Sequence, residues 1–158
     1  MSQQDDQQED PILQWVTYQL GDEVYGINVM QVQEVLRITE IAPVPGAPSY
    51  VLGIINLRGS VVTVIDTRSR FGLTPKEADD LSRIIIVEVN GNVIGMLVDS
   101  VAEVVYLHQS EIDTAPSVSN DDSSRFIQGV CSREDYLLII VDVDKFLSEE
   151  ETADFASF

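Results

Sequence analysis

Residues 50–66 read Tyr50-Val51-Leu52-Gly53-Ile54-Ile55-Asn56-Leu57-Arg58-Gly59-Ser60-Val61-Val62-Thr63-Val64-Ile65-Asp66 and predict a β-hairpin. The second half of this stretch, Val61 to Ile65, is rich in β-branched residues and apolar on both faces, which indicates a strand buried on both sides. Asn56 and Gly59 flank the tip, and both tolerate the backbone conformations that a tight reversal requires. We therefore expect a stiff hairpin with a single cation, Arg58, at its apex.

The composition places limits on the kind of protein. A chain of 158 residues with 44% hydrophobic residues can form one domain, or two small lobes that share a core. No apolar run reaches the length of a membrane span, and the polar, acidic start does not resemble a signal peptide. We expect a cytoplasmic protein without membrane insertion. The net charge of −18 disfavours binding to nucleic acid and to anionic membrane surfaces.

The residues of common catalytic and metal sites are sparse. His108 is the only histidine and Cys131 the only cysteine, so the two cannot form a zinc site by themselves. The motifs typical of nucleophile elbows, phosphate-binding loops, dinucleotide sites and zinc proteases are absent. We therefore expect no enzyme activity, no cofactor and no metal, although a site assembled from dispersed residues would leave no motif.

The chain between its two polar ends is a series of short strands separated by turn residues. Residues 1–11 are rich in Gln and Asp and predict a disordered arm, and residues 149–158 form an acidic tail. Asn90-Gly91 is the strongest hairpin signal in the chain. Asp142 is placed as an N-cap, and apolar residues at helical spacing follow it, which predicts a short closing helix over 143–148.

The sequence contains an internal duplication. The segment from Val24 to Val35 aligns without a gap on Val93 to Val104, and the segment from Gly53 to Asp66 aligns on Gly129 to Asp142. Each half thus contains about five short strands in the same order. Because no segment supplies crossover helices for a parallel sheet, the pattern predicts a mainly β protein of two similar barrels packed side by side. We expect the first barrel at about 13–70 and the second at about 83–142.

The two copies differ at the hairpin tip, where Arg58 of the first corresponds to Glu134 of the second. A residue needed only to make the turn would have no reason to reverse its charge. Two interpretations of Arg58 stay open from the residues alone, a solvated turn residue and a functional cation.

The chain resembles the CheW family, the coupling proteins of bacterial chemotaxis arrays. The resemblance lies in Tyr25-Gly26 leading to Val32-Gln33-Glu34-Val35, and in the tip from Gly53 to Gly59 running into Val64-Ile65-Asp66. It covers about residues 12–148, nearly everything outside the two tails. It implies two packed five-stranded SH3-like β-barrels with a short C-terminal helix.

The resemblance also implies a function, that of a non-catalytic adaptor. Such adaptors couple the cytoplasmic tips of methyl-accepting chemoreceptors to the regulatory domain of the histidine kinase CheA, and they are recruited to membrane-associated receptor arrays. The motif match implies receptor binding by Val32, Glu34, Asn56, Arg58 and Gly59, with Val32 and Glu34 on the side of Arg58. An apolar floor with a few oriented charges suits a groove that accepts a helix. The kinase-binding residues stay unknown.

Three alternatives remain. Glu34 and Arg58 can simply pair with each other at the surface. The domain can serve the histidine kinase of a different pathway, or it can be a small β-barrel enzyme or ligand binder, since a fold alone does not define a function.

The C-terminal Asp154-Phe155-Ala156-Ser157-Phe158 resembles the pentapeptide with which some chemoreceptors recruit adaptation enzymes, which implies weak docking of the methyltransferase. A tail without a partner is the competing interpretation.

Overall fold

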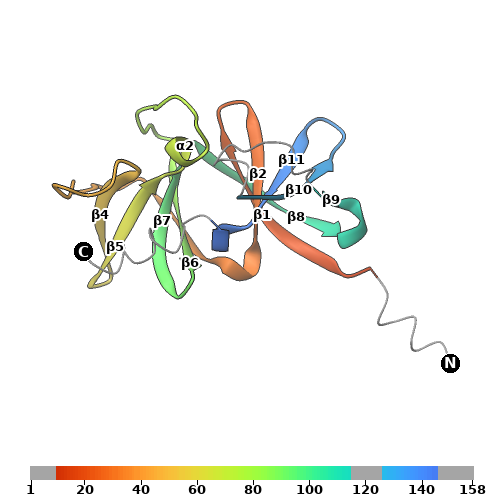
Figure 1. Ribbon diagram of the computed structural model, residues 1–158, viewed down its shortest axis with the longest axis horizontal. Helices are drawn as coiled ribbons and strands as arrows, with labels where there is room; N and C mark the ends of the chain where they lie inside the picture. The colour runs from red at the N-terminus through yellow and green to blue at the C-terminus, as the bar shows by residue number, and fades with distance from the viewer. Residues whose placement is uncertain (1–9, 115–125, 146–158) are drawn as a thin grey trace.

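The computed structural model describes residues 10–114 and 126–145, which form two β-sheets lying side by side (Figure 1). The six-stranded sheet has the order β8-β1-β2-β11-β10-β9 and the five-stranded sheet the order β3-β6-β7-β5-β4. The first consists of β1 (Ile12–Leu20), β2 (Glu23–Asn28), β8 (Ser100–His108), β9 (Asp113–Thr114), β10 (Ile127–Ser132) and β11 (Leu137–Val141). The second consists of β3 (Val32–Arg37), β4 (Val51–Leu57), β5 (Ser60–Asp66), β6 (Arg83–Val89) and β7 (Asn92–Val98).

The predicted mainly β fold of two packed SH3-like barrels is confirmed, with short helical turns between the strands. These turns are η1 (Val29–Gln31), α2 (Thr67–Arg70), η2 (Gln109–Glu111) and η4 (Val143–Lys145). In the described residues the closing helix is the single 3-10 turn η4, in which the N–H of Lys145 donates to the carbonyl of Asp142 at 3.1 Å. The remainder of the predicted helix, the acidic tail and most of the N-terminal arm lie outside the described residues.

The two repeats exchange strands between the sheets. β1 and β2 of the first repeat join β8, β10 and β11 of the second, whereas β6 and β7 of the second join β3, β4 and β5 of the first. The strand pairing therefore differs from a division into one barrel at 13–70 and another at 83–142. The physical reason is the parallel pairing of β2 with β11 and of β5 with β7, since parallel neighbours cannot be joined by a short hairpin and come from distant segments.

Backbone contacts confirm that the two copies are equivalent in space. The N–H of Asp66 donates to the carbonyl of Tyr50 at 2.8 Å, and the N–H of Asp142 donates to the carbonyl of Phe126 at the same distance. Tyr50 and Phe126 occupy the same place in the two aligned segments. Each aspartate then caps the turn that follows it, α2 and η4 respectively. The duplication in the sequence is thus also a duplication of local structure.

Three apolar clusters hold the fold together. The largest contains side chains of both sheets and lies between the barrels, with Tyr18, Tyr25, Phe71 and Phe126 forming a chain of aromatic contacts in it. A second cluster lies within the six-stranded sheet around Trp15. The third lies within the five-stranded sheet and consists of Ile55, Val62, Val64, Ile84 and Ile86. Because the largest cluster is shared, the two barrels form one packed unit.

Candidate functional site

The predicted hairpin tip is a two-residue turn between β4 and β5. Leu57 pairs with Ser60, and the intervening Arg58 and Gly59 have φ angles of 53° and 87°. Positive φ at both central residues defines the tight turn that matches the twist of a hairpin. The side-chain oxygen of Asn56 accepts a hydrogen bond from the N–H of Gly59 at 3.1 Å. Asn56 and Gly59 therefore shape the tip, and Arg58 is the side chain that the tip presents.

Arg58 forms a two-point ion pair with Glu34 of β3. Its Nη2 contacts Oε2 of Glu34, and its Nη1 lies 3.4 Å from Oε1. The hydrogen bond to Glu34, followed by the attraction between the charges, raises the pKa of Arg58. Strands β3 and β4 are the two edges of the five-stranded sheet, so the pair joins edges that the backbone ladder leaves apart. The Arg58 side chain is 73% exposed and that of Glu34 is 27% exposed, so both charges can be reached from solvent.

Val32 does not belong to this pair, contrary to the expectation that it shares a side with Glu34. β3 contains a bulge at this point, because Val32 lies opposite Val87 of β6 while Glu34 lies opposite the adjacent Ile86. Neighbouring residues of a strand point to opposite faces, so the bulge turns Val32 and Glu34 to opposite faces of the sheet. Val32 is half-buried against the cluster between the barrels. The structure thus brings together Glu34, Asn56, Arg58 and Gly59 and places Val32 apart from them.

An open hollow of 380 Å³ lies along the edge strand β4, next to the tip. It is lined by Glu40, Ala42, Ile54, Ile55, Asn56 and Val61. Val61 is one of the exposed large hydrophobic side chains. Among the predicted residues, only Asn56 lines this hollow.

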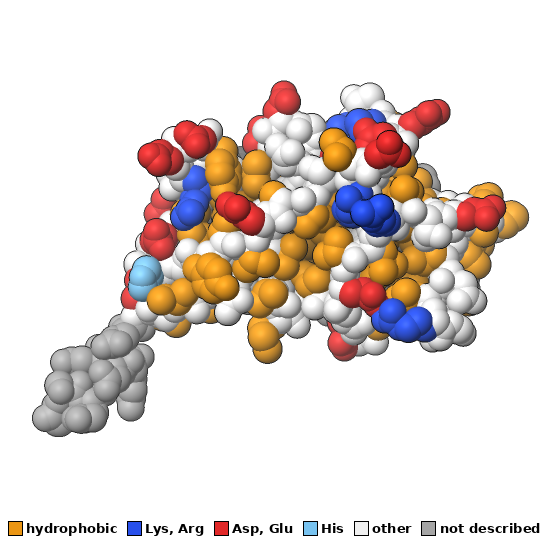
Figure 2. Space-filling view, turned by 180° about the vertical axis from the view of Figure 1, so that it is seen from behind, with side chains coloured by type: hydrophobic (Ala, Val, Ile, Leu, Met, Phe, Trp, Pro, Cys, Tyr) orange, Lys and Arg blue, Asp and Glu red, His pale blue; other side chains and the backbone are white. Residues whose placement is uncertain are grey.

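The rest of the surface combines apolar side chains with carboxylates. Figure 2 shows hydrophobic side chains extending across both barrels, with most acidic side chains around the rim of this face. Among the residues that the structure describes, the large hydrophobic side chains exposed to solvent are Ile12, Met30, Val35, Val61, Leu81, Val93, Val104, Tyr106 and Leu137. Such a surface offers contact area to a protein partner, with a preference for cationic side chains at its border.

His108 and Cys131 lie on different strands of the six-stranded sheet. His108 is exposed at the end of β8, where its Nδ1 is 3.7 Å from a carboxylate oxygen of Asp10. Cys131 is a free cysteine buried in β10. Within 10–114 and 126–145, no group of three or more His, Cys, Asp or Glu side chains could hold a metal ion. No helix in the same ranges is both long enough and apolar enough to span a bilayer.

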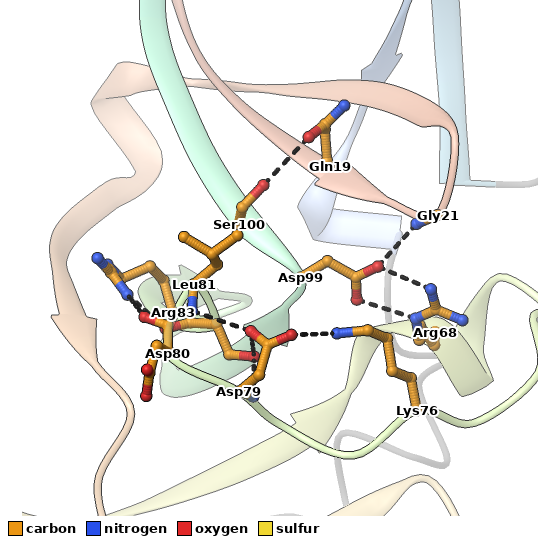
Figure 3. A network of polar contacts seen from close by, with 11 residues as sticks. Gln19, Gly21, Arg68, Lys76, Asp79, Asp80, Leu81, Arg83, Asp99 and Ser100 are labelled. Atoms are coloured by element: carbon orange, nitrogen blue, oxygen red, sulfur yellow. Dashed lines mark hydrogen bonds and ion pairs between the residues drawn. The ribbon is translucent and has the colours of Figure 1, made fainter.

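The sequence did not predict a polar network that ties the two barrels together (Figure 3). Arg68 of α2 donates from Nε and Nη2 to the two oxygens of Asp99, at 2.9 and 2.7 Å, and from Nη1 to the carbonyl of Thr74 at 2.6 Å. The N–H of Gly21 also donates to Asp99, at 2.8 Å. The hydrogen bonds from Arg68 and, to a smaller extent, the one from Gly21 lower the pKa of Asp99. The network joins the β1–β2 turn to α2 and to the link between β7 and β8.

The fold and the candidate site are thus two small fused β-barrels with an exposed ion pair at a hairpin tip. The model of the CheW-like domain matches residues 14–151, and the chain belongs to that family. The chain is 34% identical to chemotaxis protein CheW of Treponema pallidum, over 94% of this chain and 89% of that protein. It is also 34% identical to CheW of Bacillus subtilis, with 87% and 88% covered. The crystal structure of scaffolding protein TtCheW from Thermoanaerobacter tengcongensis superposes with a TM-score of 0.80 at 34% identity, covering 87% of this chain and 94% of that one.

Proposed function

We propose that this protein is a non-catalytic adaptor of chemotaxis signal transduction. In this role it couples the cytoplasmic tips of methyl-accepting chemoreceptors to the regulatory domain of the histidine kinase CheA, in the cytoplasm at membrane-associated receptor arrays. The family, the relatives named chemotaxis protein CheW and the similar scaffolding protein support the proposal. The same scaffold in the kinase pathway of another system is the second candidate.

The observation that carries the proposal is the Arg58–Glu34 pair. The tip holds Arg58 outward on a rigid turn, and Glu34 fixes the guanidinium without burying it. A helical receptor tip needs a docking surface with a few charges in fixed positions. In the six-stranded sheet the equivalent tip, between β10 and β11, carries Glu134, so this arrangement exists once in the molecule and gives the adaptor a distinct receptor side.

The test is CheA autophosphorylation with a receptor signalling fragment, in the presence and absence of this protein. We expect stimulation by the wild type and its loss with Arg58→Glu, because the change replaces the presented cation by an anion beside Glu34. The matched control is Arg37→Glu, which makes the same change of charge on an exposed residue of the same strand as Glu34. The control should stimulate normally.

Each outcome has a defined meaning. Stimulation that survives in a folded Arg58→Glu variant would remove the receptor site and leave the adaptor role. No stimulation with the cognate receptor and kinase would favour a different kinase pathway. Docking of the methyltransferase by Asp154–Phe158, which lie outside the described residues, is tested by deleting these five residues and measuring the affinity for that enzyme. Unchanged affinity would exclude it.

A further inference from the structure

The inter-barrel network around Arg68 has an equivalent position in the other half of the molecule. The aligned repeats place five residues of the network opposite five others along the chain. Gln19, Gly21, Arg68, Asp99 and Ser100 correspond to Glu88, Asn90, Asp144, Met30 and Gln31, in that order. Each set lies where the chain passes from one sheet to the other, at Asp99 between β7 and β8 and at η1 between β2 and β3.

The first position is filled by the chain itself. The side chains of Arg68 and Asp99 are only 15% and 18% exposed, and Figure 3 shows them facing each other beneath the β1–β2 turn. Ser100 donates to Gln19 at 3.2 Å and completes the network. The Arg68 guanidinium therefore neutralises the Asp99 carboxylate at this crossing point. The network connects the β1–β2 turn, α2 and the link between β7 and β8.

The second position is open. A hollow of 380 Å³ is lined by Met30, Gln31, Glu88, Asn90, Gly91 and Asp144, which include all five counterparts of the network. Asp144 stands where the arginine would be and Met30 where the aspartate would be. Asn90 donates to the backbone carbonyl of Asp144 at 3.2 Å, a bond that does not involve the Asp144 carboxylate. The Met30 side chain is 86% exposed, an unusual exposure for a methionine.

We propose that this hollow binds an arginine side chain of a partner protein, which takes the place that Arg68 takes at the other crossing point. Glu88 and Asp144 supply two carboxylates, and the Asn90 side chain and the backbone of Gly91 supply polar groups beside them. The proposal rests on the hollow and on the equivalent position, which Arg68 fills in the other half of the molecule. The acidic side chains of the hollow favour an occupant with a positive charge.

The lining suits arginine better than the other common side chains. A guanidinium is planar, carries several donors and pairs with carboxylates at two points, whereas an ammonium acts as a single point charge. The apolar stem of an arginine can lie along the exposed thioether of Met30, which is flexible and polarisable. An anionic partner group would be repelled by the carboxylates of Glu88 and Asp144.

The hollow adjoins the surface assigned to receptor binding. Met30 and Gln31 form the end of η1, and β3 with Glu34 begins at the next residue, Val32. A partner that contacts Glu34 and Arg58 can therefore reach the hollow along the same strand. The identity of the partner as a chemotaxis protein rests on the proposed function, but the arginine site itself does not.

The first experiment uses the full chain and the peptide acetyl-Gly-Arg-Gly-amide, followed by amide NMR shifts. We expect saturable shifts at Gln31, Asn90 and Gly91, and none with the same peptide in which the uncharged citrulline replaces arginine. Glu88→Gln combined with Asp144→Asn should weaken binding by about tenfold or more, because each change removes a charge-assisted contact. Asp79→Asn, a carboxylate outside the hollow, is the control and should leave the binding unchanged.

The second experiment closes the hollow from within. The double variant Met30→Asp with Asp144→Arg recreates the pair Asp99–Arg68 at the second crossing point. We expect it to fold with an unfolding temperature at or above that of the wild type and to lose the peptide shifts. It should also lose affinity for the receptor fragment, because the hollow adjoins the surface assigned to receptor binding.

Two results would overturn the proposal. One is equal shifts with the arginine and citrulline peptides or no saturable shifts at all. The other is unchanged peptide binding by the folded double variant. Both results concern the peptide alone, so they leave the kinase assay of the adaptor role untouched. Conversely, an absence of kinase stimulation together with normal peptide binding would contradict the proposed function and would still support the arginine site.

Discussion

Arg68 donates hydrogen bonds to both carboxylate oxygens of Asp99, the single residue between β7 of one sheet and β8 of the other. The chain crosses from barrel to barrel at this residue, so the pair fixes the crossing point to α2. Gly21 adds a third contact from the β1–β2 turn. Hydrogen bonds are directional, so this polar network helps to fix the relative orientation of the two barrels. The apolar cluster between the barrels contributes a non-directional attraction.

Replacing Asp99 by Asn should destabilise the protein by about 1.5–3 kcal/mol at neutral pH, because hydrogen bonds to a charged group are lost and Arg68 is left partly buried without its counter-ion. Urea unfolding followed by circular dichroism measures this change. Asp22→Asn, an exposed carboxylate in the turn beside Gly21, is the matched control and should unfold like the wild type. Equal midpoints for the Asp99 and Asp22 variants would contradict the structural role of the pair.

The same pair gives a pH dependence of defined sign. Arg68 lowers the pKa of Asp99 in the folded protein below its ordinary value of 3.8. A carboxyl group whose folded pKa is lowered adds stability above its unfolded pKa and loses it as the pH falls through the folded pKa. The difference in unfolding free energy between wild type and Asp99→Asn should therefore be constant near neutral pH and shrink below about pH 4. A difference that grows on acidification would be inconsistent with this sign.

Gly53 lies in the edge strand β4, where the neighbouring backbone leaves no room for a side chain. A Cβ at this position would lie 2.2 Å from the carbonyl oxygen of Ala42, which exchanges two backbone hydrogen bonds with Ile54. We expect Gly53→Ala to lower the unfolding free energy by about 2–3 kcal/mol, because backbone must move to make room. The urea midpoint should fall while the slope of the transition stays unchanged.

Gly26→Ala is the control for this substitution. Its Cβ would approach only side chains, the nearest at 3.4 Å, so its effect should be clearly smaller. The equivalent glycine of the second repeat is Gly129, where a Cβ would lie 2.6 Å from the carbonyl oxygen of Asp113, and it should behave like Gly53. Similar losses for Gly26 and Gly53 would show that the close approach at Ala42 does not limit the size of residue 53.

The sequence predicts the strands and the turns well, because both depend on local patterns. The hairpin from 50 to 66 and the Asn90-Gly91 turn are found as expected. The exchange of strands between repeats does not follow from the sequence, since an alignment of two copies shows which segments are alike and not which of them pair. Parallel pairing of β2 with β11 depends on contacts between distant segments, and periodicity carries no information about these.

The site was predicted in part for a similar reason. The charge difference between Arg58 and Glu134 drew attention to the tip, and the structure adds the contact of Arg58 with Glu34. The bulge that turns Val32 away from Glu34 appears only in the pairing of β3 with β6, which involves a distant segment of the chain. The alignment of the repeats places Met30 opposite Asp99, and this difference between the two copies is the sequence signal for the hollow.

Exchanging the two charges of the tip pair separates its structural role from its binding role. The double variant Glu34→Arg with Arg58→Glu keeps an ion pair between the edges of the sheet, whereas each single change places like charges together. We expect the thermal stability of the double variant to exceed that of either single variant. If Arg58 contacts the receptor, the double variant should still fail to bind the receptor fragment, with affinity reduced by about tenfold or more. Recovery of binding in the double variant would assign the pair a purely structural role.

Arg58 also adopts a backbone conformation that suits another residue better. Its φ of 53° lies in the left-handed region, where asparagine is favoured over residues with long side chains, and Asn90 occupies the same kind of position in the β6–β7 turn. Arg58→Asn should therefore relieve strain and raise the unfolding temperature by roughly 2–4 °C, offset in part by loss of the contact with Glu34. The same variant should bind the receptor fragment more weakly, because the presented cation is gone. Calorimetry on one preparation measures both the stability and the binding. A rise in stability together with a loss of binding would show that Arg58 serves binding although it strains the turn. A variant that is less stable and binds normally would refute that interpretation.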